Sequence, residues 1–351
     1  MKLAWWKLLS IFLLFYTLIF GLLVPLKTGI TDVNPRKIQC GQKITLLAQG
    51  YNSLYTRYKS PHAWLKLDSV HALAATAIRV KNDRLMEIDF ETPAYLPDTQ
   101  KVKELTLVID DVVDGVSLLP NATFINRGDT TNIQVGKAAW SKIITGTHAH
   151  QGIAFPYRNI LYETIRNTYF HVPMWFVMFT LFGVAVYYNI KFLRTGDLTW
   201  DIRAYSFIQV GVLFGLLGLF TGALWATYTW GEPFPMDLKI VMTYTALSIY
   251  FAYFLLRGAF ESFEQRARIS SVYSIFAFAS LIPLLYVVPR LAGKDSLHPG
   301  NGGNIAFGSQ DLDNTMRLIF YPASIGWILL GIWIATLVTR TLLIEDKLFS
   351  K

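Results

Sequence analysis

Six long runs of apolar residues recur along the chain, and polar segments separate them. Each run is near the roughly 20 residues that a helix needs to cross the hydrocarbon core of a bilayer. The pattern therefore predicts a multi-pass α-helical membrane protein with six transmembrane helices. The predicted helices are Trp5 to Leu26, Val172 to Leu193, Ala204 to Tyr228, Leu238 to Arg257, Ile269 to Val288 and Leu318 to Thr339.

The region between the first two runs has a different pattern. It carries more charge, and turn residues separate short alternating runs such as Met86–Phe90 and Leu105–Ile109. Its opening, Ile30 to Pro35, loosely resembles the first strands of an immunoglobulin-like module. We therefore expect an all-β, immunoglobulin-like, extracytoplasmic insertion. The expected domains are 1–28, the first helix; 29–158, the β-sandwich-like insertion; and 159–351, a five-helix membrane domain.

Composition supports the membrane class, and the cations indicate its orientation. Hydrophobic residues make up 53% of the chain and charged residues only 16%, which is unlike an ordinary soluble protein. Lys and Arg gather at cytoplasmic helix ends in membrane proteins. The predicted cytoplasmic side carries Lys2, Lys7, Lys191, Arg194, Arg203, Arg257, Arg266, Arg268, Arg340, Lys347 and Lys351, and the other side carries Lys239, Arg290, Lys294 and Arg317. Both termini are therefore expected in the cytoplasm, and this bias accounts for the net charge of +8 without nucleic acid.

The first run has an alternative interpretation as a cleaved signal peptide, because Lys2 and Lys7 precede its apolar core. The run is long for a signal core. The residues after it, Val24 to Lys27, lack the small-residue pair that a signal peptidase needs. These features favour a membrane anchor.

The stretch 221–240, between the third and fourth runs, is rich in aromatic residues and is broken by Gly and Pro. Gly231, Pro233 and Pro235 interrupt helical structure on either side of Phe234, which favours an exposed ring. With Trp225 and Trp230 the stretch predicts an aromatic ledge at the membrane surface. Such a ledge suits a flat, amphipathic ligand.

The same stretch carries a family resemblance. Trp225-Ala226, Trp230-Gly231 and Asp237-Leu238-Lys239-Ile240 resemble the WWD segment of the haem-handling proteins of cytochrome c maturation, in particular the haem exporter protein C branch. The spacing of the segment is kept, while Phe234 and Met236 replace its last two tryptophans. His171-Val172-Pro173 and His298 stand where the family has its two external histidines. The resemblance covers roughly Glu163 to Leu343.

The resemblance implies that haem b is the ligand and that His171 and His298 are axial ligands of its iron. The ring would lie against Trp225, Trp230, Gly231, Phe234 and Met236, and Lys239 and Arg317 would contact the propionates. Each residue also has an ordinary explanation: a histidine at a helix end, an aromatic belt, or a cation that reaches lipid phosphate. Asp237 precedes the fourth helix and is expected to cap it.

Several other chemistries have no support in the sequence. Cys40 is the single cysteine, so the chain has neither an internal disulfide nor a Cys-x-x-Cys-His site for covalent haem. The motifs for ATP hydrolysis and for the common hydrolases are also missing. His148 and His150 form only a weak candidate metal site, because two histidines need further ligands.

The predicted function is to bind haem and present it on the external face of a bacterial inner membrane for cytochrome c maturation. The expected partners are haem, a haem chaperone or apocytochrome c, ABC transporter subunits and the lipid bilayer, with no nucleic acid. Two alternatives remain: a cytochrome c synthetase, which attaches haem itself, and a membrane transporter unrelated to haem. No histidine lies deep in a predicted span, which argues against the synthetase. No ionisable residue lies well inside a predicted span, which argues against a proton-coupled pump.

Overall fold

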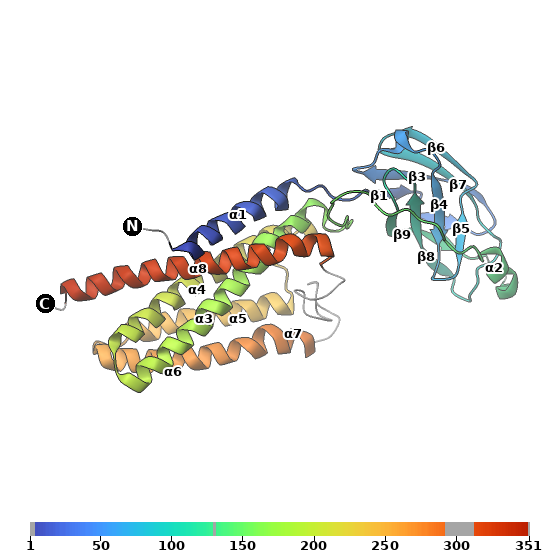
Figure 1. Cartoon of the computed structure of the whole chain (residues 1–351). Helices are drawn as coiled ribbons and strands as arrows, with labels where there is room; N and C mark the ends of the chain where they lie inside the picture. The colour runs from blue at the N-terminus through green and yellow to red at the C-terminus, as the bar shows by residue number, and fades with distance from the viewer. Residues whose placement is uncertain (1–3, 129–130, 292–311, 350–351) are drawn as a thin grey trace. The chain divides into compact units, whose positions relative to one another are not determined.

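The structure is a computed structural model, and it describes residues 4–128, 131–291 and 312–349. The chain divides into two compact units (Figure 1). One unit is helical and combines Met1–Leu23 with Glu163–Lys351, and the other, Val24–Tyr162, is built mainly from strands.

Within the described residues, six helical stretches of the helical unit are long and apolar enough to cross a membrane, which confirms the predicted class. The fifth stretch is continuous from α6 through a π-helical turn at Pro283–Val287 to the short helix α7 (Figure 1). The helices are α1 (Trp5–Leu23), α3 (Thr168–Thr195), α4 (Leu198–Trp230), α5 (Leu238–Gly258), α6 (Phe263–Ile282), α7 (Val288–Leu291) and α8 (Asn314–Phe349).

A tight turn joins α3 and α4 into an antiparallel hairpin. Gly196 ends α3 with a left-handed backbone, φ 71°, which glycine adopts at little cost. Asp197 then begins α4, because its Oδ1 accepts a hydrogen bond from the backbone N–H of Thr199 at 2.9 Å. The beginning of α3 and the end of α4 therefore lie at the same end of the helical unit.

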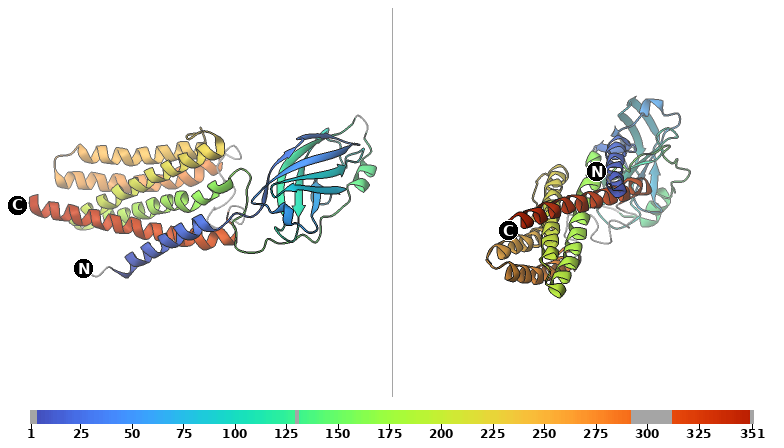
Figure 2. Two further views of the ribbon diagram at one scale, coloured as in Figure 1. Left: turned by 90° about the horizontal axis from the view of Figure 1, so that it is seen from above. Right: turned by 60° about the vertical axis from the view of Figure 1, so that its left-hand side comes forward.

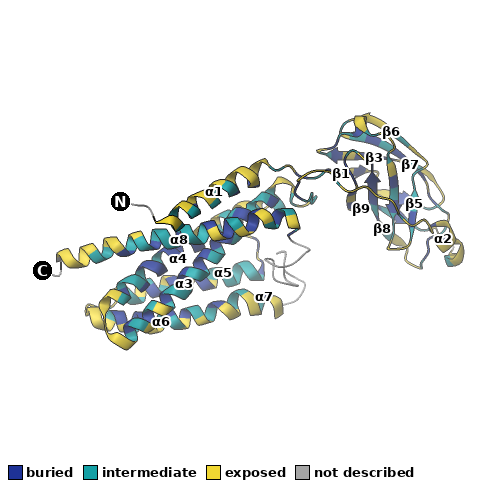
Figure 3. Ribbon diagram, viewed as in Figure 1, coloured by how far each residue is buried: buried dark blue, intermediate teal, exposed yellow. Residues whose placement is uncertain are grey.

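Glycines let α4 approach its neighbours closely. A Cβ atom at Gly211 would lie 2.5 Å from the Phe182 ring of α3, and one at Gly215 would lie 2.7 Å from Leu247 of α5. The buried residues of the unit are accordingly concentrated on α3 and α4, whereas α1 is largely exposed (Figure 3). A mostly exposed, apolar α1 is typical of a helix that faces lipid.

Helices α1 and α8 lie side by side and run in opposite directions (Figures 1 and 2). The Ser10 hydroxyl donates to the Gly326 carbonyl at 3.0 Å, and the Tyr16 hydroxyl donates to the Leu318 carbonyl at 3.2 Å. The beginning of α1 and the end of α8 therefore lie at one end of the unit. The beginning of α8 lies at the other end, together with the beginning of α3.

A buried ion pair links α4 and α5 at the end of the unit where α4 begins. The guanidinium of Arg257 donates to both carboxylate oxygens of Asp201, at 2.8 and 2.5 Å. The side chains are only 11% and 6% exposed, and the Tyr205 ring covers the guanidinium at 4.5 Å. The sequence did not reveal this pair, because Asp201 precedes the expected start of the helix at Ala204.

The second unit contains two β-sheets, which confirms the predicted β region. Their orders are β1-β3-β7-β6 and β2-β9-β8-β4-β5, and β2 pairs with β9 in parallel. The strands are β1 (Gly29–Asn34), β2 (Lys37–Gln39), β3 (Lys43–Tyr51), β4 (His62–Lys66), β5 (Ala72–Ala74), β6 (Ala77–Asn82), β7 (Leu85–Glu91), β8 (Val102–Asp110) and β9 (Ser117–Asn126).

The buried faces of both sheets share one apolar core, to which Leu46, Ile88 and Leu107 belong. Trp140, which follows the short helix α2 (Ile133–Ala139), is fully buried in the same core and donates its indole N–H to the Tyr95 carbonyl at 3.2 Å. The core therefore includes residues well beyond the last strand.

Candidate functional site

His171 lies in the first turn of α3 and faces α4. Its Nδ1 is 3.0 Å from the carbonyl oxygen of Gly218 and 3.2 Å from Oγ1 of Thr221. Both partners belong to the second half of α4, so the α3–α4 hairpin holds the ring from its Nδ1 side. The sequence placed this histidine just outside the span, and the structure places it within the helix.

Two indoles surround the imidazole of His171. The ring of Trp175, one helical turn further along α3, lies 6.0 Å away and nearly perpendicular, and its Nε1 is 3.4 Å from Nε2 of His171. The ring of Trp225 on α4 lies 5.8 Å away at 81° and donates its N–H to Thr164 Oγ1 at 3.1 Å. Trp225 thus contacts the histidine and is more than a member of an aromatic belt.

Gly222 provides the space that the imidazole occupies. A Cβ atom at this position would lie 2.8 Å from Cε1 and 3.3 Å from Nδ1 of His171. No side chain fits there unless the ring moves. The imidazole position is therefore fixed by close packing as well as by hydrogen bonds.

The predicted ledge begins where α4 ends. Gly231 follows Trp230 with φ 87° and donates its N–H to the Thr227 carbonyl at 3.1 Å, which ends the helix. Beyond it the side chains of Phe234 and Met236 are 59% and 92% exposed. Two large apolar side chains in such open positions give an accessible surface for a flat apolar ligand.

Asp237 caps α5, as expected from the sequence. Asp237 is 4% exposed, and its carboxylate accepts a hydrogen bond from the backbone N–H of Lys239 at 2.9 Å. Lys239 therefore sits in the first turn of α5, next to the ledge. Arg317 lies in the first turn of α8, where its backbone N–H donates to the Asp313 carbonyl.

These residues gather at one end of the helical unit, where α3, α5 and α8 begin and α4 ends. The end includes His171, Trp225, Trp230, Gly231, Phe234, Met236, Asp237, Lys239 and Arg317. His298, the second predicted iron ligand, lies outside the described residues. The structure thus brings nine of the ten predicted site residues to the same end of the bundle.

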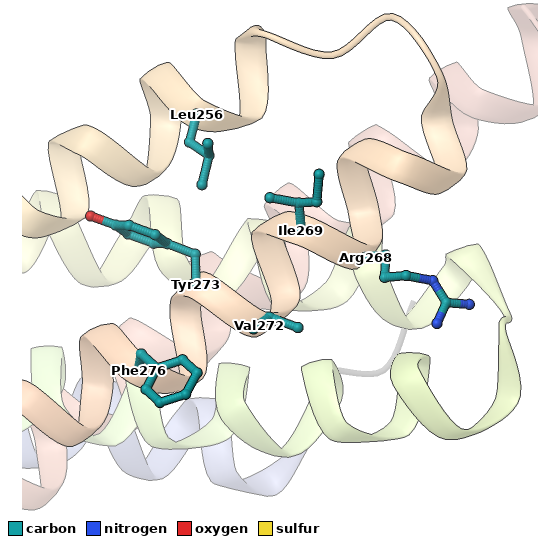
Figure 4. A pocket seen from close by; sticks show the side chains of 6 residues that line it. All are labelled: Leu256, Arg268, Ile269, Val272, Tyr273 and Phe276. Atoms are coloured by element: carbon teal, nitrogen blue, oxygen red, sulfur yellow. The ribbon is translucent and has the colours of Figure 1, made fainter.

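An apolar groove between α5 and α6 belongs to the opposite end (Figure 4). Leu256, which lines it, follows Asp237 by 19 residues on a continuous helix, a separation of about 28 Å along the axis. The groove is lined by Leu256, Arg268, Ile269, Val272, Tyr273 and Phe276. It is therefore separate from the aromatic ledge.

The histidines of the β unit have structural partners. Nδ1 of His148 is 2.8 Å from the buried carboxylate of Asp110, and Nδ1 of His150 is 3.1 Å from the Asp114 carbonyl. Among the described residues, no group of three or more His, Cys, Asp or Glu side chains is placed to hold a metal ion. The two histidines instead attach the segment after α2 to the β8–β9 turn.

Sequence reasoning missed the residues that surround His171, namely Thr164, Trp175, Gly218, Thr221 and Gly222. The sequence contained one signal for them. Gly211, Gly215, Gly218 and Gly222 recur at intervals of four, three and four, which marks one face of a helix for close packing. That face is the one that meets α3.

A sequence model of Heme exporter protein C, CcmC, matches residues 128–350, well over half of the chain. The chain belongs to this family. The match begins ahead of α2 and continues through the whole helical unit after α1. A search of curated proteins found no match.

Family membership confirms the resemblance seen in the 221–240 segment and identifies the chain as a membrane protein of haem export and handling for cytochrome c maturation. Residues 1–127 precede the matched region. The nine strands found in the described residues and α1 belong to this preceding part.

Proposed function

We propose that this chain binds haem b noncovalently at the end of the bundle that carries His171 and the aromatic ledge. The observation that carries the proposal is that a fixed imidazole and exposed apolar side chains lie at the same end of the helical bundle. An imidazole nitrogen is a ligand for haem iron, and aromatic and thioether side chains are suitable contacts for a porphyrin face.

The residues present fit such a ligand. His171 is held between two indoles and supplies the imidazole. Phe234 and Met236 offer apolar surface, and Lys239 and Arg317, in the first turns of α5 and α8, supply cations for the two propionates. His298 would supply a second iron ligand, and its sequence match alone supports this part of the proposal.

In this proposal the chain binds and orients haem, and it forms no bond to the vinyl groups. The haem iron supplies the coordination site for histidine. His171 would hold the iron, the ledge would cover one face of the ring, and the cations would orient the propionates. The missing Cys-x-x-Cys-His sequence agrees with noncovalent binding.

We further propose that the site faces the external side of a bacterial inner membrane and that both termini are cytoplasmic. The cation bias supports this orientation, and the beginning of α1 and the end of α8 lie at the same end of the helical unit (Figure 2). A haem chaperone or apocytochrome c would receive haem there, with ABC transporter subunits as partners. Reporter fusions near Asp201 and Lys351 that are active only outside the cell would contradict this orientation.

For the β unit we propose an immunoglobulin-like fold. Its order β1-β3-β7-β6 corresponds to the A-B-E-D sheet of that fold, and β9-β8-β4 corresponds to G-F-C. We also propose that this unit folds independently and does not bind haem. Residues 29–158 expressed alone should give a β-rich circular dichroism spectrum. A Soret band that survives gel filtration after haem addition would contradict the second part.

The direct test of haem binding is the absorption spectrum of the purified protein with added haem. We expect a low-spin spectrum with two histidine ligands. His171→Ala should convert the iron to a high-spin or water-ligated form, and His171→Ala with His298→Ala should lose nearly all haem. If both single variants keep the wild-type spectrum and haem content, these two histidines are not the ligands.

A further inference from the structure

The environment of His171 determines which ring nitrogen carries the proton. Nδ1 lies 3.0 Å from the Gly218 carbonyl oxygen, which can only accept a hydrogen bond. Nδ1 must therefore carry a hydrogen. The nearby Thr221 hydroxyl is compatible with this assignment, because it donates its own proton to the Leu217 carbonyl at 2.8 Å and can accept from Nδ1.

The contact at Nε2 of His171 independently indicates the same tautomer. Trp175 Nε1 is 3.4 Å from Nε2 of His171, and an indole nitrogen can only donate. Nε2 must therefore present its lone pair. Two partners from different helices, one an acceptor and one a donor, thus select the same neutral tautomer. The lone pair on Nε2 is the group that would bind iron in the proposed site.

We propose that Trp175 is a displaceable partner of the iron-binding nitrogen: in the haem-free protein its indole N–H donates to Nε2 of His171, and haem iron takes its place. This inference rests on the proposed function, because it assumes that His171 binds iron. Gly218 and Thr221 keep their hydrogen bonds to Nδ1 when haem binds, whereas Trp175 loses its hydrogen bond to Nε2.

The geometry supports this division of roles. The Trp175 contact, at 3.4 Å, is longer than the usual 2.7–3.2 Å range of N–H hydrogen bonds, whereas the Gly218 contact lies within that range. Trp175 also follows His171 by four residues on one helix, so the two side chains share a face. The indole therefore remains beside the ligand whether or not it donates.

Gly218 positions the indole as well as the imidazole. A Cβ atom at Gly218 would lie 2.8 Å from Cε2 and Cζ2 of Trp175. The same residue therefore gives its carbonyl to His171 and gives space to Trp175. This packing on Gly218 brings the indole N–H of Trp175 close to Nε2 of His171, and no residue of the ledge takes part in it.

The first arm of the test uses no haem. Nitrogen-15 NMR of the haem-free protein with labelled histidine distinguishes a protonated ring nitrogen from one with a lone pair, and His171→Ala assigns the resonance. We expect a protonated Nδ1 and a lone pair on Nε2. Trp175→Phe should shift the Nε2 signal, and the control Trp200→Phe, at the opposite end of α4 and stacked on Tyr188, should not. A protonated Nε2 in the wild-type protein would overturn the inference.

The second arm measures haem binding by Soret absorbance. Trp175→Phe keeps an aromatic ring but removes the competing N–H, so haem should bind about two- to tenfold more tightly, with an unchanged final spectrum. Unchanged or weaker binding would overturn the displacement. If His171→Ala binds haem as the wild type does, the proposed function fails; if His171→Ala loses haem and Trp175→Phe leaves its affinity unchanged, only the present inference fails.

Discussion

Substituting alanine for Gly222 should displace His171, the proposed iron ligand, without weakening the fold. The new Cβ would lie 2.8 Å from Cε1 of His171, whereas ordinary contacts begin at 3.4 Å. The imidazole must therefore move by about 0.6 Å, because its ring is rigid and cannot yield. A shift of that size away from α4 lengthens the 3.0 Å contact from Nδ1 to the Gly218 carbonyl beyond hydrogen-bonding range.

Gly222→Ala should lower the affinity for haem and leave the stability of the fold nearly unchanged. Loss of an outer-shell hydrogen bond to a metal-binding histidine typically lowers affinity about 10- to 100-fold, and we expect Gly222→Ala to weaken haem binding by that factor. Alanine is better than glycine in a helix by about 1 kcal/mol, which offsets the local strain in the free energy of unfolding. The thermal midpoint of the haem-free protein should consequently change little.

Gly183→Ala is the matched control. Gly183 lies in α3, and a Cβ there would be 3.6 Å from the Phe278 ring, an ordinary contact. Haem titration followed by Soret absorbance should show wild-type affinity for this variant. If Gly222→Ala also binds haem with wild-type affinity and an unaltered spectrum, the packing between α3 and α4 does not position the ligand and the reasoning is wrong.

Three further outcomes follow from the same structure. Trp230→Ala should weaken haem retention, measured by gel filtration, without changing the ligation spectrum, because the indole would contact the ring and not the iron. Asp201→Asn should lower the free energy of unfolding by about 3–5 kcal/mol, since it leaves the buried Arg257 guanidinium without its charge partner; a denaturation midpoint equal to that of the wild type would contradict this. Burial raises the pKa of Cys40, and Arg127 opposes the shift weakly, so alkylation by iodoacetamide should reach half its maximal rate at a higher pH than for an exposed thiol. An alkylation profile that coincides with that of a free cysteine would show that the side chain is open to solvent.

The sequence predicted the features of this protein that depend on local pattern. Apolar runs of fixed length identified the six membrane helices, and Gly231 and Asp237 marked the end of α4 and the start of α5. These signals need only the propensities and capping preferences of neighbouring residues. The exposed ring of Phe234 followed for the same reason, because proline and glycine on either side prevent a helix there.

The sequence did not predict the features that depend on tertiary contacts. Asp201 and Arg203 ended the apolar run, so the expected helix began at Ala204, whereas α4 begins at Leu198. The Asp197 cap begins α4 at Leu198, and the Arg257 side chain, 56 residues from Asp201, pairs with the Asp201 carboxylate inside the helix. No pattern within either segment announces such a partner.

The same limit applies to the surroundings of His171. Its identity as a candidate ligand came from the family resemblance, but its orientation depends on the Gly218 carbonyl, 47 residues away. A carbonyl leaves no signal in the sequence, because every residue has one. Only the glycine spacing on α4 indicated that another helix approaches that face.

The contrast between the fixed imidazole and the open ledge is consistent with a protein that must both take up and release haem. His171 is held by contacts from two helices, so little ordering is required when iron binds. Phe234 and Met236, in contrast, are largely exposed. Binding energy grows with the area removed from water, so an open ledge holds the ring less tightly than an enclosed site would. We therefore expect affinity to depend mainly on iron ligation, and an acceptor that offers its own ligand could remove the haem.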